Sequence, residues 1–291
     1  MSYQVYSNGK EVSGELSLDL MRTEAVGIFE SMRSYGGRIL HEKDHLVRLC
    51  ESAKTVGYSP LPGIKVLRRE LGLALKASGE KNTSVRLTLL DGKVFVIVGA
   101  RECAKELYKK GVVLKTASFP RGGPSTFPWQ VKASAYQQAI LASTEPHPDR
   151  IYEWVFLDLQ GLLTETRVGN FFLVKYPVNG TVSENLKTGS WTGSGAMLLT
   201  PPEHLILNGV TRRFVIKCAL ELGFQVREVP LTRHEFFNAD EAFLCNTSWE
   251  ILPVHELDGR VIGVGKPGPV TLKLHRFFKR RVQQDVTSHR S

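Results

Sequence analysis

A ten-residue segment near the middle of the chain divides the sequence into two parts. It reads Phe119-Pro-Arg-Gly-Gly-Pro-Ser-Thr-Phe-Pro128 and interrupts every apolar periodicity around it. Proline and glycine concentrated in this way are typical of a connection between domains. We therefore predict a small N-terminal α/β domain over residues 1–118, a linker over 119–128 and a larger C-terminal domain over 129–291.

The part before the linker alternates between strand-like and helix-like patterns. Apolar residues at helical spacing predict helices over residues 41–56 and 64–78, the second ending at Gly79. Asp91-Gly92 between two apolar runs predicts a hairpin. Strands are predicted over residues 3–6, 27–34, 84–90, 93–98 and 112–117.

The part after the linker has the same mixed character. Helices are predicted from Lys132 to about Ser143, over 211–222 and over 270–281, and strands over 151–158, 170–175, 225–229 and 241–245. Residues 176–195 are polar and rich in glycine and serine, which indicates a surface insertion. Neither GxGxxG after a strand nor GxxxxGK[ST] occurs, so the standard nucleotide-binding loops are absent. The predicted fold class is mixed α/β (α+β) in two domains.

The charge balance raises the question of an anionic partner. Lysine and arginine number 38 and acidic residues 29, so the 291-residue chain carries a formal net charge of +9. Nucleic acid, a membrane surface and an anionic small molecule are the candidates. With 42% hydrophobic and 23% charged residues, the composition excludes a disordered or collagen-like chain.

The cysteines and the N-terminus predict a cytoplasmic protein with reduced thiols and no bound metal. Cys50, Cys103, Cys218 and Cys245 are widely spaced and form no CxxC pair. The N-terminus has no apolar signal core. The longest apolar run, residues 94–98, is too short to cross a bilayer.

Two segments carry chemically distinctive side chains. If the segment around Lys132 is helical, Lys132 and Tyr136 lie one turn apart, and an amine beside a phenol suits Schiff-base formation with a carbonyl. A solvated lysine at a helix start is the alternative. Glu165 lies five residues before Asn170. A carboxylate there can hold a heterocyclic nitrogen protonated, or it is an ordinary loop glutamate.

Two further segments are candidate anion sites. Leu207-Asn-Gly-Val-Thr-Arg212 leads into a predicted helix, whose first N–H groups and the Thr211 hydroxyl suit an anion. The alternative is that Thr211 caps the helix. Cys245-Asn-Thr-Ser-Trp-Glu-Ile-Leu-Pro253 follows a strand with polar residues, which form either a second anion site around Thr247 or a strand-ending turn.

Together these segments resemble the class IV aminotransferases, the fold-type IV pyridoxal-phosphate enzymes. That family includes branched-chain aminotransferases, D-amino-acid aminotransferases and aminodeoxychorismate lyases. The resemblance covers most of the chain, from Gly27-Ile-Phe-Glu-Ser-Met-Arg33 through His45-Leu-Val-Arg-Leu49 to Gly263-Val-Gly-Lys-Pro-Gly-Pro269. It implies pyridoxal 5′-phosphate as cofactor at the domain interface, a homodimer, and no nucleic-acid or membrane partner.

The resemblance also implies a role for each matched residue. Lys132 matches the catalytic lysine that forms a Schiff base with the cofactor, and Glu165 matches the carboxylate that faces the pyridine nitrogen. The remaining cofactor-binding positions are Arg48, Tyr136, Val210, Thr211 and Thr247. The positions on the substrate side are Phe29, Arg86, Ser248 and Trp249.

The sequence departs from the family pattern in four places: residues 20–27 lack the usual Gly-Asp, residues 176–195 lengthen a normally short connection, and two single positions differ. Tyr136 follows Lys132 by four residues, whereas branched-chain enzymes have five. Arg167 stands where the family usually has a small residue. We expect its side chain to point to solvent, the alternative being contact with an acidic substrate.

The end of the chain favours one activity. Gly-Lys-Pro-Gly-Pro269 and Ser-Trp-Glu-Ile-Leu-Pro-Val254 look more like transaminases than lyases. We predict amino transfer between a branched-chain-like amino acid and a 2-oxo acid. The alternative is an aminodeoxychorismate lyase forming 4-aminobenzoate and pyruvate in the folate pathway, with which Arg86-Leu-Thr-Leu89 is compatible. A D-amino-acid aminotransferase is disfavoured because its Arg-x-His motif has no counterpart after Gly92. A non-catalytic basic binding module is supported by the charge alone.

Overall fold

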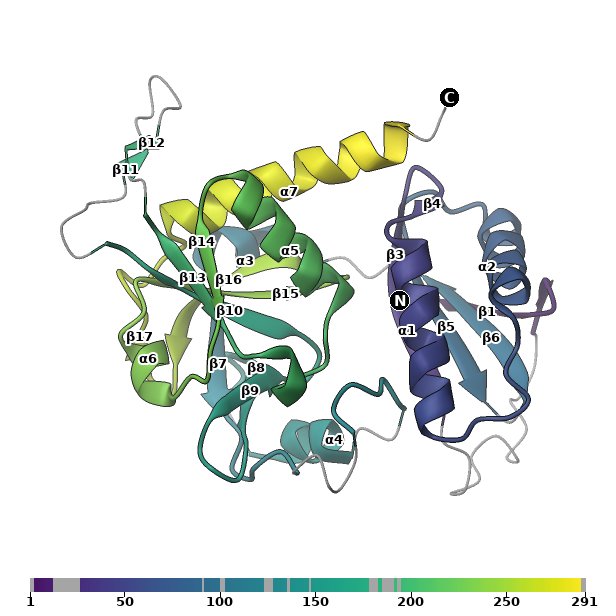
Figure 1. Cartoon of the computed structure of the whole chain (residues 1–291), viewed down its shortest axis with the longest axis horizontal. Helices are drawn as coiled ribbons and strands as arrows, with labels where there is room; N and C mark the ends of the chain where they lie inside the picture. Colours follow the sequence, from purple (N-terminus) through teal and green to yellow (C-terminus); the bar gives the residue numbers. More distant parts are fainter. Residues whose placement is uncertain are drawn as a thin grey trace. The chain divides into compact units, whose positions relative to one another are not determined.

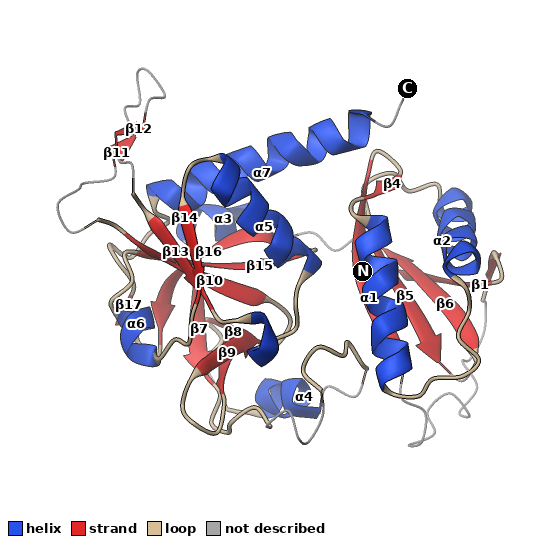
Figure 2. Ribbon diagram, in the orientation of Figure 1, coloured by secondary structure: helices blue, strands red, loops and turns tan. Residues whose placement is uncertain are grey.

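The chain folds into two compact units with mixed α/β structure, as the sequence predicts. The computed structural model describes residues 3–12, 27–90, 92–99, 103–122, 128–134, 137–146, 148–177, 183–184, 191–192 and 195–288. The first unit comprises Met1–Glu102, Gln130–Tyr136 and Val282–Ser291, and the second comprises Cys103–Trp129 and Gln137–Arg281. Figure 1 shows the elements along the chain, and Figure 2 separates helices from strands.

An antiparallel sheet forms the first unit, in the order β2-β1-β6-β5-β3-β4. Its strands are β1 (Tyr3–Ser7), β2 (Lys10–Glu11), β3 (Ile28–Tyr35), β4 (Arg38–Ile39), β5 (Ser84–Leu90) and β6 (Lys93–Gly99). Helices α1 (Glu42–Thr55) and α2 (Ile64–Ser78) pack on it. Their apolar residues recur every three or four positions, so one stripe of each helix joins the core.

A larger sheet of mixed direction forms the second unit, in the order β14-β13-β10-β15-β16-β7-β8-β9, with β17 paired to β16. Its strands are β7 (Val112–Thr116), β8 (Ile151–Leu157), β9 (Leu163–Thr166), β10 (Asn170–Lys175), β13 (Met197–Thr200), β14 (Gln225–Glu228), β15 (Glu241–Asn246), β16 (Glu250–Leu257) and β17 (Arg260–Val261). A separate pair is made by β11 (Ser183–Glu184) and β12 (Trp191–Thr192).

The helices of the second unit are α3 (Lys105–Lys110), α4 (Gln137–Thr144), the short 3₁₀ helix η2 (Glu203–Leu205), α5 (Val210–Glu221), α6 (Arg233–Phe237) and α7 (Pro269–Ser288), whose last turns count with the first unit. Aromatic contacts join α7 to α5 and to α3. Phe214 of α5 meets Phe278 of α7 with ring centroids 5.0 Å apart. Tyr108 of α3 stacks on His275 of α7 at 5.1 Å.

The compact units do not coincide with the sequence-based boundaries. Strand β7 lies before the predicted linker but belongs to the second unit, because it pairs in parallel with β16 and β8. Residues 130–136 lie after the linker but belong to the first unit. Lys132 is therefore part of the first unit.

The predicted helix from Lys132 to Ser143 is wrong at its start, since α4 begins at Gln137. Residues 132–134 are instead held as an edge segment beside the beginning of β3. The amide of Phe29 donates to Lys132 O at 3.0 Å, and the amide of Ser134 donates to Gly27 O at 2.6 Å. These main-chain bonds replace the i to i−4 bonds that a helix would need.

A buried ionic cluster joins β3 to α1 in the first unit. The Glu30 carboxylate accepts two bonds from Arg48, from Nε and Nη2, each at 2.7 Å. His45 Nδ1 donates to it at 2.7 Å. Burial opposes ionisation of Glu30, but Arg48 and His45 outweigh it and lower the pKa of Glu30 to about 2. Burial also lowers the pKa of His45.

A second buried carboxylate fixes the start of α7 in the second unit. Glu241 of β15 accepts hydrogen bonds from the amides of Val270 at 2.9 Å and Thr271 at 2.8 Å. Tyr176 Oη donates to the same carboxylate at 2.5 Å. Gly268 passes so close that an added Cβ would lie 2.0 Å from Glu241 Cδ. Only glycine fits there without displacing the carboxylate that caps the helix.

Gly268→Ala should therefore lower the free energy of unfolding, by about 1–3 kcal/mol, because the new methyl group overpacks the Glu241 site. The control is Gly72→Ala in the interior of α2, where an added Cβ meets nothing within 4 Å. That change should stabilise the protein by up to about 1 kcal/mol, because alanine favours the helix. Urea unfolding monitored by circular dichroism measures both. Equal stability of Gly268→Ala and wild type would contradict the packing described for Glu241.

The Glu30 cluster predicts an acid-dependent loss of stability. Because the pKa of Glu30 falls from 4.5 to about 2 on folding, its contribution is complete above about pH 4.5 and disappears as the pH falls toward 2. The contribution is on the order of 3 kcal/mol. Glu30→Gln should flatten the unfolding free energy over that pH range, whereas Glu51→Gln on the exposed face of α1 should not. Parallel pH profiles of Glu30→Gln and wild type would refute this.

Candidate functional site

Three predicted residues of the first unit lie together around the ring of Phe29. Lys132 Nζ is 4.9 Å from the ring centroid, and Arg86 Cζ is 3.7 Å from it. Phe29 and its neighbour Glu30 point to opposite faces of β3, because strand side chains alternate. Glu30 meets α1, so Phe29 and the two cations occupy the other face of the sheet.

Helix α1, which carries Arg48, also contacts the segment that contains Lys132. Ser52, one turn after Arg48, accepts a hydrogen bond at its Oγ from the amide of Lys132 at 3.3 Å. The positive charge of Lys132 is also one of the influences that lower the pKa of His45, after burial and Arg48. Arg48 is thus a buried, oriented cation in the unit that contains Lys132.

In the second unit, Glu165 of β9 is buried and both of its carboxylate oxygens have partners. Oε1 is paired with Arg121 Nη1 at 2.5 Å. Oε2 accepts from Asn170 Nδ2 at 3.0 Å and from the amide of Leu207 at 3.1 Å. A carboxylate held in this way is a fixed negative charge, suited to a protonated ring nitrogen. Glu165 lies within strand β9 and not in a loop, which is the alternative interpretation of the sequence.

Helix α5 begins after a residue that cannot cap it. The N-cap is Gly209, which makes no side-chain cap hydrogen bond, and Thr211 lies inside the helix, so the cap by Thr211 predicted as one alternative is wrong. Val210 and Thr211 form the first turn of this helix. Arg212, also in that turn, is buried and donates from Nη2 to Pro201 O and to Glu228 Oε2, each at 2.8 Å. A helix start with this geometry is suited to an anion.

The Thr247–Trp249 segment is a turn between β15 and β16. The amides of Ser248 and Trp249 both donate to Asn246 Oδ1, at 2.9 and 2.7 Å. Asn246 Nδ2 donates to Val168 O at 3.1 Å. The amides of these two predicted substrate-side residues therefore bond to the chain's own Asn246 in this structure.

Antiparallel pairing brings the predicted residues of the second unit to one end of its sheet. Asn170, the first residue of β10, pairs with Cys245 near the end of β15. Glu165, the α5 start and the 247–249 turn are consequently grouped around this pair. Burial raises the pKa of the Cys245 thiol to about 12, so it is not a thiolate nucleophile at neutral pH.

Two residues correct or extend the expectations from sequence. Arg167 does not simply point to solvent: its Nε pairs with the buried Glu153 at 3.1 Å, and its guanidinium lies 5.1 Å from the Trp154 ring centroid. The sequence does not indicate that Arg121 is a site residue, because an isolated arginine in a Gly/Pro segment has no periodic pattern around it. Tyr136 lies outside the described residues.

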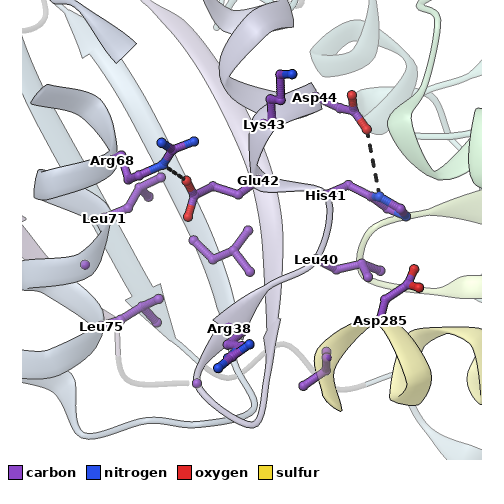
Figure 3. Close-up of a pocket in the computed structure, with 14 residues that line it drawn as sticks. Arg38, Leu40, His41, Glu42, Lys43, Asp44, Arg68, Leu71, Leu75 and Asp285 are labelled. Carbon is purple, nitrogen blue, oxygen red and sulfur yellow. Dashed lines mark hydrogen bonds and ion pairs between the residues drawn. The ribbon is translucent and has the colours of Figure 1, made fainter. Parts of the chain in front are cut away.

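Two cavities in the described part of the chain lie away from these residues. One of about 610 Å³ in the first unit is lined by residues of the β3–α1 connection, α2 and the end of α7, and includes His41, Arg68 and Asp285 (Figure 3). Another, of about 390 Å³, lies beside α6 in the second unit. Neither lining contains a predicted site residue. Among the described residues no cluster of His, Cys, Asp or Glu suits a metal ion, and no helix is long and apolar enough to span a membrane.

Known proteins are similar to this chain in sequence and in fold along nearly its whole length. A "Putative branched-chain-amino-acid aminotransferase" of Methanocaldococcus jannaschii is 32% identical over 294 residues, covering 95% of each chain. The crystal structure of a branched-chain aminotransferase from Thermoproteus uzoniensis with norvaline is 28% identical, with TM-score 0.79, covering 98% of this chain and 96% of that one. A T.th. branched-chain amino acid aminotransferase with pyridoxamine 5′-phosphate has the same fold at 24% identity, TM-score 0.81, covering 97% and 94%.

The family model for class IV aminotransferases matches residues 27–257, a stretch that contains every residue discussed above for the candidate site. Together with the relative that is 32% identical, this match shows that the chain belongs to the class IV aminotransferase family.

Proposed function

We propose that this enzyme is a pyridoxal 5′-phosphate-dependent aminotransferase that moves an amino group between a branched-chain-like amino acid and a 2-oxo acid. The observation that carries the proposal is the arrangement around Phe29, where the Lys132 amine and the Arg86 guanidinium share one aromatic ring. An amine for the cofactor carbonyl and a cation for a carboxylate substrate are the two groups that this reaction requires beside each other.

The described residues fit the chemical parts of the cofactor. A dianionic phosphate suits the start of α5, where Val210 and Thr211 form the first turn. Arg48 stays a predicted cofactor contact. Glu165 suits the ring nitrogen, because its charge is fixed by Arg121 and Asn170. When bound, pyridoxal phosphate supplies a ring that withdraws electrons from the substrate Cα. Thr247 and Tyr136 stay predicted cofactor contacts.

The chain's own residues account for the other requirements of the reaction. The Lys132 amine is the general acid and base that carries the proton between the substrate Cα and the cofactor carbon. Arg86 orients the substrate carboxylate through charge-assisted hydrogen bonds. The Phe29 ring lies against both cations and keeps the two side chains beside each other. Ser248 and Trp249 remain predicted substrate contacts whose amides would first have to leave Asn246.

Aliphatic amino acids are the proposed donors because the matched relatives are named branched-chain aminotransferases. A panel of L- and D-amino acids with 2-oxoglutarate as acceptor tests the activity, with glutamate formation as the readout. We expect glutamate with L-leucine, L-valine or L-isoleucine. Formation of pyruvate and 4-aminobenzoate from aminodeoxychorismate, without transamination, would instead support the lyase.

Lys132→Ala should abolish both the yellow absorbance of the cofactor-loaded protein and amino transfer, because no other amine is proposed to bind the cofactor carbonyl. The loss of rate should reach at least about 10²-fold, as expected for removal of a general base. Lys93→Ala, at an exposed position of β6 in the same unit, is the matched control and should stay yellow and active. Retention of the absorbance by Lys132→Ala would exclude the proposed role.

Arg86→Met should raise the KM for amino acid and 2-oxo acid by about 10- to 100-fold, because a charge-assisted bond to the carboxylate is lost. Cofactor absorbance should be unchanged. Arg33→Met is the control, since Arg33 also stacks on a ring, Tyr35, with its Cζ 5.0 Å from the centroid. Unchanged KM values in Arg86→Met would remove Arg86 from the substrate side.

A further inference from the structure

Asn170 is buried at the first position of β10, where its side chain makes contacts that sheet pairing does not require. Main-chain pairing with Cys245 fixes its backbone. Its amide group, by contrast, has two N–H donors that must find acceptors once removed from water. The acceptors are Glu165 Oε2 and Leu207 O, each 3.0 Å from Nδ2.

These contacts close a ring of hydrogen bonds. The amide of Leu207 donates to the same Glu165 Oε2 at 3.1 Å, so the carboxylate, the Asn170 amide and the Leu207 peptide each bond to the other two. Arg121 restrains only the other oxygen, Oε1, at 2.5 Å. Of the two donors to Oε2 described here, only the Leu207 amide would remain without Asn170. The Glu165 carboxylate could then rotate about its contact with Arg121.

The opposite side of the Asn170 amide lies against the start of α5. A Cβ built on Gly209, the N-cap of that helix, would lie 2.2 Å from Asn170 Oδ1. The backbone of Gly209 has φ −63° and ψ 132°, which alanine adopts without strain. The glycine is therefore required by the presence of the Asn170 side chain and not by its own conformation.

We propose that Asn170 is a positioning residue that locks the Glu165 carboxylate in register with the first turn of α5. The inference rests on the proposed function, in which Glu165 faces the cofactor's ring nitrogen and α5 receives its phosphate. One amide group then aligns two parts of the cofactor site, Glu165 and Val210, that are 45 residues apart in the chain. Asn170 acts through Glu165 and does not itself contact the ring.

The test compares two ligands on the whole protein with the cofactor removed. One is pyridoxal 5′-phosphate, and the other is its analogue in which carbon replaces the ring nitrogen. The readout is the ratio of their dissociation constants. General damage to the fold weakens both ligands and leaves this ratio unchanged, whereas a misplaced Glu165 weakens only the ligand that has the nitrogen.

We expect wild type to prefer pyridoxal 5′-phosphate by about tenfold or more, the size of effect expected from a hydrogen bond to a charged group. Asn170→Ala and Asn170→Asp should bring the ratio close to one. Aspartate has the shape of asparagine but no N–H donor. Asn170→Asp therefore tests the same hydrogen bonds if the alanine variant does not fold. Gly209→Ala should reduce the ratio as well, because its methyl group displaces Asn170 Oδ1.

Two control variants show how far the ratio can fall and whether loss of an unrelated amide changes it. Glu165→Gln should lower the ratio as far as the Asn170 variants do. Asn238→Ala removes an amide that donates to His234 O at 2.8 Å at the end of α6, and should keep the wild-type ratio. A wild-type ratio retained in both Asn170 variants overturns the inference. A wild type that binds neither ligand overturns the proposed function, and a wild type that binds both equally overturns the role of Glu165 and the inference with it.

Discussion

The position of Lys132 depends on main-chain hydrogen bonds with the first residues of β3. The chain leaves the first unit after β6 and contributes β7 to the second unit. It returns for only a few residues, in which Lys132 O accepts from Phe29 and Ser134 donates to Gly27. A lysine on a free loop would spread its amine over many rotamers. Backbone pairing to a buried strand restricts it to the face that carries Phe29 and Arg86.

The charged candidate residues within each unit are buried and paired. Glu30 orients Arg48 in the first unit, and Arg121 and Asn170 orient Glu165 in the second. A buried charge without a partner costs several kcal/mol. Glu30 and Arg48 therefore stabilise the fold only as a pair, and so do Glu165 and Arg121. The same pairing leaves each group preorganised, since little reorientation is needed when a ligand arrives. Much of the chain's net charge of +9 still lies on exposed lysines and arginines such as Lys279 and Arg280.

Periodic patterns identify much of the fold. The helix predicted over 64–78 coincides with α2, and those predicted over 41–56 and 211–222 differ from α1 and α5 by one residue at each end. One apolar stripe of each helix packs on a sheet, which makes the pattern readable. The hairpin at Asp91-Gly92 is confirmed by the pairing of Leu90 with Lys93. Strand β16 is not predicted, since it begins at Glu250 with a φ of 60° and contains Pro253. Such a conformation depends on tertiary contacts, here the buried pair of Glu250 with His275 at 3.0 Å.

The site is less predictable than the fold. Arg48 and Glu165 are found through family resemblance, and their burial supports their choice, yet Glu30, Arg121 and Asn170, which hold them, have no motif of their own. The ion pairs of Glu30 with Arg48 and of Arg121 with Glu165 join residues 18 and 44 positions apart. At such separations neither helical nor strand periodicity carries information.

In the proposed reaction, Lys132 is the amine that binds the cofactor. Borohydride reduction of the loaded protein, followed by proteolysis and peptide mass spectrometry, tests this role directly. We predict a single phosphopyridoxyl-modified peptide, with the label on Lys132. A label on another lysine, or no label on a protein that has bound the cofactor, would contradict it.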